Sequence, residues 1–176
     1  MSAYAIVTME ERHLPAVLDI YNYYVMNTTA TFHAQPLSLD EMRQVVFFDD
    51  PRYQSYVIQD TAGKLCGYAI LMQYKKRQAY DRTAEVSVYL TPDCPGRGLG
   101  SMALQHIEQT AWQRDIHVLL GVVCGENQPS RDLFIRNGYQ QCAHLREVGT
   151  KFDRILDIIF YQKILTDRGE THADSG

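Results

Sequence analysis

The chain has 176 residues, which is the length of one ordinary domain with a full hydrophobic core. Hydrophobic residues make up 45% and charged residues 22%, a balance that excludes disordered, collagen-like and low-complexity classes. The net charge of −4 argues against a general nucleic-acid binder, and apolar stretches such as residues 118–123 are far short of the roughly 20 residues of a membrane span. No segment has the pattern of a secretory signal, so we expect a cytoplasmic protein with no nucleic-acid and no membrane partner.

The first half of the chain carries four strand patterns and two helix patterns. Residues 3–9 have an apolar strand core, and the apolar residues from Leu14 to Val25 recur with the period of a helix. Ser38 and Glu41 form a capping box, which predicts a second helix from there to about Phe48. The next strands are expected over residues 55–59, 65–73 and 83–90.

A glycine-rich turn follows the strand at 83–90 and opens a helix that we expect to end near Arg114. The continuous apolar run 117–123 is typical of a strand buried on both faces. A short helix over 130–136 is expected to end at Asn137-Gly138 with a left-handed cap. The last two strands are expected over residues 139–148 and 154–163.

This order of elements, β-α-α-β-β-β-α-β-α-β-β, predicts an α/β fold with a mixed, mostly antiparallel sheet. We find no internal repeat and no linker composition, so residues 1–165 are expected to form one domain. Residues 166–176 are polar and lack periodicity, which predicts a flexible C-terminal tail.

The cysteines and histidines are scattered along the chain without metal-site spacing and without a CxxC pair, so we expect no metal. Four free thiols in a reducing compartment are a better interpretation than a disulfide framework. Cys94 lies beside the glycine-rich turn with no histidine nearby, which favours a bystander thiol over a nucleophile.

The glycine-rich turn, Gly96-Arg97-Gly98-Leu99-Gly100-Ser101, is a candidate phosphate site. Its glycines allow a ligand to approach the backbone closely, and the free N–H groups of the first helical turn favour an anion. The alternative is a tight strand-to-helix turn that needs glycine for its geometry alone. The turn lacks the GKS or GKT of a Walker loop, and no acidic residue lies at the position that a Rossmann fingerprint requires.

At this point the sequence resembles a known family. The run Val86-Ser87-Val88-Tyr89-Leu90, then Pro92-Asp93, then 96–100, resembles motif A of the GNAT superfamily of acetyl-CoA-dependent N-acetyltransferases. Further stretches resemble the phosphinothricin and methionine sulfoximine acetyltransferases of that superfamily, and together they span about Ile20 to Gln162. These stretches are residues 20–22, 27–32, 75–85, 125–127 with Ser130, 137–139, 146–149, 151–152, 156–157, Phe160 and Gln162.

The resemblance implies a single GNAT-like domain whose central strands splay apart to hold acetyl-CoA. The pantetheine arm is then expected to pair with the backbone of Val88, Tyr89 and Leu90 like an added strand. The pyrophosphate is expected on the turn formed by Gly96, Arg97, Gly98, Leu99, Gly100 and Ser101, and Asn127 is expected to contact the cofactor. No metal takes part.

Glu85 matches the family's glutamate and is our candidate general base, because an amine attacks a thioester only after losing its proton. A backbone N–H near Leu90 is the candidate oxyanion donor. The alternative for Glu85 is a solvated strand residue paired with Arg82 or another cation.

Four residues, at three places in the chain, depart from the family's common pattern. Phe134 stands where relatives often carry a Tyr or His that can protonate the leaving thiolate, so water or another group must do so. Pro95 replaces a common Arg or Gln and removes one backbone N–H. Asp153 and Ile155 replace a common Gly and Trp near the substrate side or the dimer seam.

The basic and aromatic segment 74–82 has three interpretations: nucleic-acid contact, a solvated loop, or a rim that attracts an acidic amino-acid-like substrate. The resemblance favours the third and places Gln78, Ala79 and Tyr80 on the substrate side. Phe32 is a candidate for the same pocket, with core packing as its alternative.

We therefore expect an N-acetyltransferase that acetylates the amine of a small amino-acid-like molecule such as phosphinothricin, methionine sulfoximine or methionine sulfone. The resemblance also implies a homodimer. Two alternatives remain open: acetylation of another amine (a polyamine, a peptide N-terminus or an antibiotic), and a non-catalytic acyl-CoA-binding module.

Overall fold

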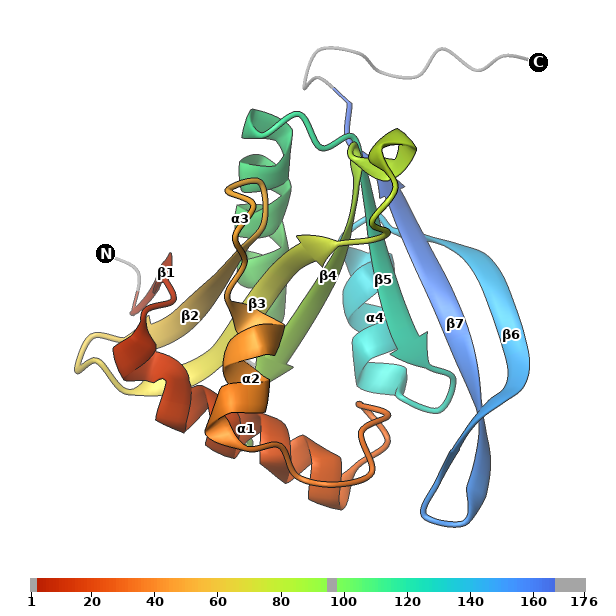
Figure 1. Ribbon diagram of the computed structural model, residues 1–176, viewed down its shortest axis with the longest axis horizontal. Coiled ribbons are helices and arrows are strands. Elements are labelled where there is room, and N and C mark those ends of the chain that lie inside the picture. The colour runs from red at the N-terminus through yellow and green to blue at the C-terminus, as the bar shows by residue number, and fades with distance from the viewer. Residues whose placement is uncertain (1–2, 95–97, 167–176) are drawn as a thin grey trace.

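The computed structural model describes residues 3–94 and 98–166, and the expected flexible tail lies almost wholly outside these residues. The described residues form a twisted seven-stranded sheet with helices on both faces (Figure 1). The strands are β1 (Tyr4–Thr8), β2 (Gln54–Asp60), β3 (Leu65–Gln73), β4 (Thr83–Leu90), β5 (Val118–Cys124), β6 (Gln140–Lys151) and β7 (Arg154–Ile164). The helices are α1 (Leu14–Asn27), α2 (Leu39–Val46), α3 (Leu99–Gln113) and α4 (Gln128–Arg136), with 3-10 turns η1 (Glu11–His13) and η2 (Gln78–Tyr80).

The order of the strands in the sheet is β1-β2-β3-β4-β5-β7-β6. All neighbours are antiparallel except β4 and β5, whose connection is the crossover helix α3. This parallel pair is registered over three residues only, from Thr83↔Val118 to Glu85↔Leu120. Beyond Glu85 the two strands separate, which confirms the expected mixed sheet with splayed central strands.

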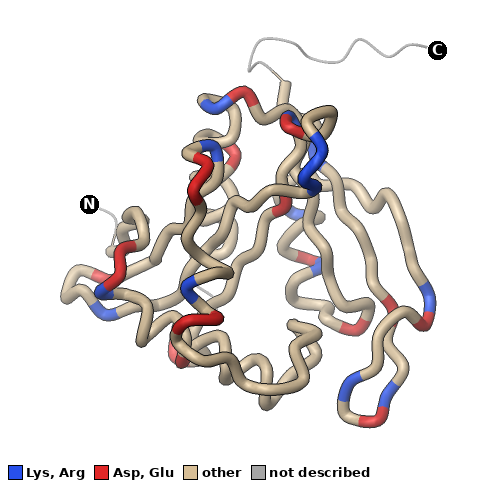
Figure 2. Tube along the Cα trace, in the orientation of Figure 1, with Lys and Arg blue, Asp and Glu red and all other residues tan. Residues whose placement is uncertain are grey.

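Alternating side chains divide the sheet between two cores. Tyr56, Ala69 and Leu71 belong to the core beneath α3 and α4, whereas Val57 and Tyr68 pack against α1 and α2. Residues i and i+2 of a strand point to one face of the sheet, and residue i+1 points to the other. Apolar side chains therefore lie on both faces, and helices cover both. Figure 2 shows that Lys, Arg, Asp and Glu lie mostly on loops and at the ends of elements.

The helix ends follow the expected local chemistry. Ser38 caps α2, with its hydroxyl accepting from the Glu41 N–H and the Glu41 carboxylate accepting from the Ser38 N–H, as a capping box requires. Gly138 has φ +82°, which confirms the left-handed cap after α4. Two boundaries differ from expectation: α2 ends at Val46, and α4 begins at Gln128 because Asn127 caps it by accepting from the Ser130 N–H.

The β6–β7 hairpin extends away from the rest of the sheet (Figure 1). Its two-residue turn, Phe152-Asp153, has φ of +53° and +56°, the geometry of a type I′ turn. Asp tolerates this conformation better than most residues, which explains how Asp153 can replace the family's glycine. None of the helices in the part of the chain that the structure describes is long and apolar enough to cross a membrane.

Candidate active site

The separation of β4 from β5 opens a cavity of about 440 Å³. One wall is the backbone and side chains of residues 86–90, and the opposite wall is formed by the end of β5 and the start of α4. The end of α1 closes a third side through Tyr24 and residues 28–30. A split sheet thus creates an elongated pocket whose walls include unpaired strand edges.

The β4 side of the cavity offers backbone groups for an extended ligand. Residues 86–90 pair with β3 along one edge, from Val86↔Leu71 to Leu90↔Gly67. Their other edge has no strand partner, because pairing with β5 ends at Glu85. Val88, Tyr89 and Leu90 all line the cavity, and an open strand edge can accept an extended chain as an added strand.

One of these backbone groups is already engaged. The Tyr24 hydroxyl donates to the Leu90 carbonyl oxygen at 2.6 Å, which joins the end of α1 to the end of β4. The Tyr24 ring also lies edge-on to the Tyr89 ring. The Leu90 carbonyl is therefore less available to a ligand than its neighbours, whereas the Leu90 N–H remains a possible donor.

The N-terminus of α3 begins with Gly98 at φ +72°, a left-handed conformation that favours glycine. No side chain of the described residues caps this helix, so the first amides are left to a ligand or solvent. The Leu99 side chain is buried in the core, so only its backbone can serve a ligand. Pro95, Gly96 and Arg97 lie outside the described residues.

Gly100 and Ser101 connect this turn to α4. A Cβ at Gly100 would lie 3.0 Å from the Leu133 side chain, so glycine allows α3 and α4 to approach closely. The Ser101 hydroxyl accepts from the Asn137 side-chain amide at 2.9 Å. Leu133 lines the cavity, and the glycine-rich segment therefore also shapes its wall.

Asn127 lies where β5 ends and α4 begins. Its side-chain oxygen accepts from the Ser130 N–H at 3.2 Å, and both residues line the cavity. The capping bond holds the Asn127 side chain at the cavity wall and leaves its amide N–H groups as the donors that a ligand could use.

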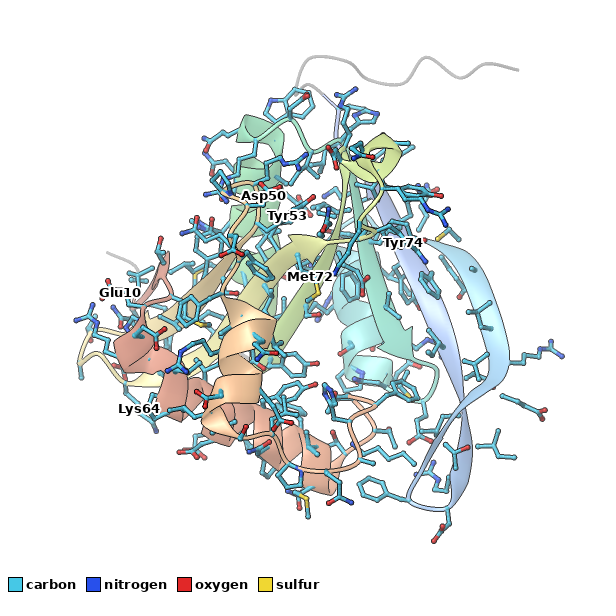
Figure 3. All side chains as sticks on the ribbon, in the orientation of Figure 1. Glu10, Asp50, Tyr53, Lys64, Met72 and Tyr74 are labelled. Carbon is cyan, nitrogen blue, oxygen red and sulfur yellow. The ribbon has the colours of Figure 1, made fainter. Side chains whose placement is uncertain are left out.

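Glu85 is the last residue of β4 that pairs with both neighbours, Met72 of β3 and Leu120 of β5 (Figure 3 labels Met72). Its side chain is half-buried, and the cavity begins at the next residue. Burial raises the pKa of the Glu85 carboxyl, and the positive charge of Lys75 opposes this shift. Arg82, a partner that the alternative interpretation named for Glu85, forms an ion pair with Asp115.

The α1–α2 connection is held over the cavity by three contacts from distant parts of the chain. The Thr29 hydroxyl donates to the Glu126 carboxylate at 2.6 Å, and the Lys151 ammonium donates to the Thr31 carbonyl at 2.8 Å. The Phe32 ring packs so closely on Gly149 that a Cβ there would lie 2.3 Å from it. Lys151 is buried, and burial lowers the pKa of its ammonium.

The structure separates the residues that we expected on the acceptor side. Gln78, Ala79 and Tyr80 form the exposed turn η2 just before β4, near the labelled Tyr74 (Figure 3). Phe32 lies at the other end of the site, against the β6–β7 hairpin. None of these four residues lines the cavity between β4 and β5.

Phe134 is a core residue as well as part of the cavity wall. Its ring stacks on Tyr161 and lies edge-on to Tyr139, and a Cβ at Gly121 would come within 2.3 Å of its para carbon. Only 5% of the residue is exposed. The ring therefore fills the space above a glycine of β5, where its size and lack of polarity suit the packing.

Val88, Tyr89, Leu90 and Asn127, which were predicted from the sequence, line the cavity, and so do Tyr24, Thr29 and Glu126, which were not predicted. The contact of Lys151 with Thr31 was not predicted either. Several of these lie in the stretches that carried the family resemblance, although nothing in their spacing indicated a contact. Thr29 and Glu126 are 97 positions apart, and Thr31 and Lys151 are 120 positions apart.

Comparisons with known proteins agree with this geometry. Residues 17–139 match the model of the Acetyltransferase (GNAT) family. The chain is 35% identical over 152 residues to the L-methionine sulfoximine/L-methionine sulfone acetyltransferase of Pseudomonas aeruginosa, covering 85% of this chain and 87% of that protein. It is 31% identical over 158 residues to the phosphinothricin N-acetyltransferase of Streptomyces coelicolor, covering 88% and 92%.

A solved structure has the same fold. The phosphinothricin acetyltransferase of Sinorhizobium meliloti in complex with acetyl-CoA superposes with a TM-score of 0.89 at 26% identity, covering 99% of this chain and 95% of that chain. Its complex contains the cofactor for which the open strand edge and the uncapped helix are suited.

Proposed function

Because the chain belongs to the GNAT family and is an acetyl-CoA-dependent N-acetyltransferase, we propose that it acetylates the amine of a small amino-acid-like acceptor by direct transfer, with Glu85 as general base. The observation that carries this proposal is the splay of β4 from β5 directly after Glu85. Glu85 lies one residue before Val86, the first β4 residue that lines the cavity, and this supports the proposal. The non-catalytic alternative is set aside by the family.

The binding of acetyl-CoA is proposed to use two kinds of backbone group. The pantetheine arm pairs with the free edge formed by Val88, Tyr89 and Leu90, and the pyrophosphate sits on the amides at the start of α3. Support comes from the unpaired edge of β4 and from the absence of a side-chain cap at Gly98 within the described residues. Asn127 adds amide donors from the opposite wall.

The reaction requires three proton and charge movements. Glu85 removes a proton from the acceptor ammonium, directly or through a water, so that the nitrogen lone pair can attack the acetyl carbon. The N–C bond forms while negative charge collects on the thioester oxygen, for which the Leu90 N–H is the proposed donor. The C–S bond then breaks, the nitrogen loses its second proton, and a water relays that proton to the thiolate because Phe134 has none to donate.

The acceptor class rests on the relatives and on the residues around Glu85. The relatives' names specify phosphinothricin, methionine sulfoximine and methionine sulfone, all small amino acids. Lys75, Lys76 and Arg77 place positive charge on the connection before η2, which suits a carboxylate or phosphinate (Figure 2). We propose that Phe32 and Gln78–Tyr80 border the acceptor from opposite ends.

A panel of acceptors tests the proposal through release of coenzyme A thiol. We expect turnover with phosphinothricin, methionine sulfoximine or methionine sulfone, and at least about tenfold lower kcat/KM with spermidine, a peptide N-terminus or an aminoglycoside. Turnover only with one of the latter group would contradict the acceptor class. No turnover with any amine, despite acetyl-CoA binding, would contradict the mechanism as a whole.

We further propose that the enzyme works as a cytoplasmic homodimer. The β6–β7 hairpin supports this because Leu145, Val148, Phe152 and Ile155 expose large apolar side chains along it. Their exposed fractions run from 43% to 67%, and β6 is an edge of the sheet.

A further inference from the structure

Two cysteines from different elements meet beneath the connection that follows β4. Cys66 is the second residue of β3, and Cys94 lies four residues beyond the end of β4. Their sulfur atoms are 2.7 Å apart although the residues are 28 positions apart in the chain. Both are buried: 1% of Cys66 and 5% of Cys94 is exposed.

Backbone hydrogen bonds hold the two thiols in this position. The Cys66 carbonyl accepts from the Thr91 N–H at 2.9 Å, and the Cys94 N–H donates to the Thr91 carbonyl at 3.1 Å. Gly67 lets β4 approach, since a Cβ there would lie 2.5 Å from the Tyr89 carbonyl oxygen. The sulfur atoms are therefore held close together by backbone hydrogen bonds of the strand and the turn.

The geometry points to an oxidation site: we propose that Cys66 and Cys94 form an intramolecular disulfide when a peroxide supplies the oxidising equivalents. A disulfide has a sulfur–sulfur distance of about 2.05 Å, so the two atoms need to approach by only about 0.7 Å. No other pair among the four cysteines is recorded in contact within the described residues.

The chemistry balances with hydrogen peroxide as oxidant. The thiolate of Cys94, the more exposed of the two, attacks one peroxide oxygen, the O–O bond breaks, and a sulfenic acid and hydroxide are formed. The sulfur of Cys66 then attacks the Cys94 sulfur, the S–S bond forms, the S–O bond breaks, and hydroxide leaves. With the two thiol protons, the products are one disulfide and two waters.

The groups around Cys66, whose sulfur attacks in the second step, keep its thiol protonated at neutral pH. Burial and the hydrogen bond with Cys94 raise the pKa of Cys66 to about 11, and Asp60 adds to the shift while Lys64 opposes it. Lys64 also pairs with Asp93, the residue before Cys94. Because the thiolate is the reactive form, the rate of disulfide formation is expected to rise with pH between 7 and 9.

If the proposed function holds, the Cys66–Cys94 disulfide lies beside the cofactor site. Cys94 lies between the cavity wall formed by residues 86–90 and the amides at the start of α3. A disulfide to β3 anchors this connection, and it also closes a loop in the unfolded chain. We therefore expect the oxidised protein to melt at a temperature higher by about 5 °C or more.

Counting thiols tests the proposal without reference to catalysis. Cys142→Ser is the background, since Cys142 is exposed and could link two molecules. The protein is treated with hydrogen peroxide at pH 7 and pH 9, unfolded, alkylated with N-ethylmaleimide and weighed by mass spectrometry. Cys94→Ser in this background removes the Cys66–Cys94 pair. Cys124→Ser is the matched control, because it removes a buried thiol and leaves the pair intact.

We expect oxidation of the background protein to reduce the number of alkylated thiols from three to one, with reversal by dithiothreitol, a faster reaction at pH 9 and the rise in melting temperature. The Cys94→Ser variant should lose no thiols in this reversible way, whereas Cys124→Ser should behave like the background. Three alkylated thiols after prolonged treatment, products that dithiothreitol does not reduce, or a Cys66–Cys124 peptide would overturn the proposal.

Discussion

Glu85 is a carboxylate whose surroundings oppose its charge. Its side chain is half-buried between Met72 and Leu120, and burial raises the pKa of its carboxyl while Lys75 limits the shift. A base with a raised pKa accepts a proton more readily than an ordinary glutamate, at the cost of being less ionised at low pH. The same burial costs folding free energy when the group is charged.

Glu85→Gln separates these two effects. We expect kcat to fall by about 10²–10³-fold because the amide cannot accept the proton, with little change in KM for acetyl-CoA. The melting temperature should stay the same or rise, since the neutral amide avoids the cost of burying a charge. Steady-state kinetics and thermal unfolding measure both, and an unchanged kcat at every pH would show that Glu85 is not the base.

The pH dependence of kcat/KM reports the same residue. Because the unprotonated carboxylate is active, the rate should rise with pH through the pKa of Glu85, which burial raises above the ordinary value for glutamate. Lys75→Met removes the charge that lowers this pKa and should move the acid limb to higher pH. Lys76→Met is the neighbouring control, because Lys76 is not among the groups that shift the Glu85 pKa. An acid limb that stays in place in both variants would contradict this assignment.

At the scale of elements, α4 packs on β5 through one ring. The para carbon of Phe134 points at Gly121, and the ring is enclosed by Tyr139 and Tyr161. The family's hydroxyl at this position therefore cannot be restored by simple substitution. The phenylalanine at position 134, which departs from the family's common Tyr or His, is part of the packing between α4 and β5.

Phe134→Tyr should lower stability by about 1–3 kcal/mol, because the added oxygen meets the backbone at Gly121. We expect no gain in kcat, and chemical denaturation together with kinetics checks both points. Phe134→Leu, which is smaller and apolar, is the comparison for lost packing without an added oxygen. A stable Phe134→Tyr variant with a raised kcat would show that the ring has room to act as the missing acid.

The hairpin and the α1–α2 connection meet at Phe32 and Gly149, where a methyl group cannot fit without moving the ring. Gly149→Ala should raise KM for the acceptor by about 5–20-fold while KM for acetyl-CoA changes less than twofold. The exposed neighbour Thr150→Ala is the control. Equal effects on the two KM values would indicate that Phe32 has no special relation to the acceptor.

At the scale of the whole molecule, the cavity depends on contacts between parts far apart in the chain, and the hairpin projects beyond them (Figure 1). Monomeric proteins rarely leave a projecting edge with several large apolar side chains uncovered. A second copy of the chain covering this hairpin is the arrangement that the proposed homodimer requires.

Ile155→Glu tests the homodimer, because Ile155 is 67% exposed on the hairpin. Light scattering after size exclusion should give the mass of a dimer for the wild type and of a monomer for the variant. Ile135→Glu is the matched control, since Ile135 is 53% exposed on α4. A monomeric wild type, or a dimer that survives Ile155→Glu, would contradict the proposed interface.

Local patterns were enough to predict the order of the elements. The capping box at Ser38, the alternation in β4 and the left-handed cap at Gly138 each depend on interactions within a few residues, and each was confirmed. The helix boundaries that differed were decided by the backbone at the helix ends: Phe47 is extended after Val46, and the Asn127 side chain caps the helix that begins at Gln128. The order of these elements indicated the fold class, whereas the family was predicted from the resemblance of short motifs to a known family.

By itself, the sequence determined the elements, the fold class, the acetyl-transfer chemistry and a candidate base. Only the tertiary structure decided where β4 leaves β5, that Phe134 is enclosed by packing, and that Phe32 and Tyr80 lie apart. It alone brought Thr29 to Glu126, Thr31 to Lys151 and Cys66 to Cys94. The physical reason is that propensity, capping and periodicity act over a few residues, whereas these contacts depend on how strands and helices pack across the whole chain.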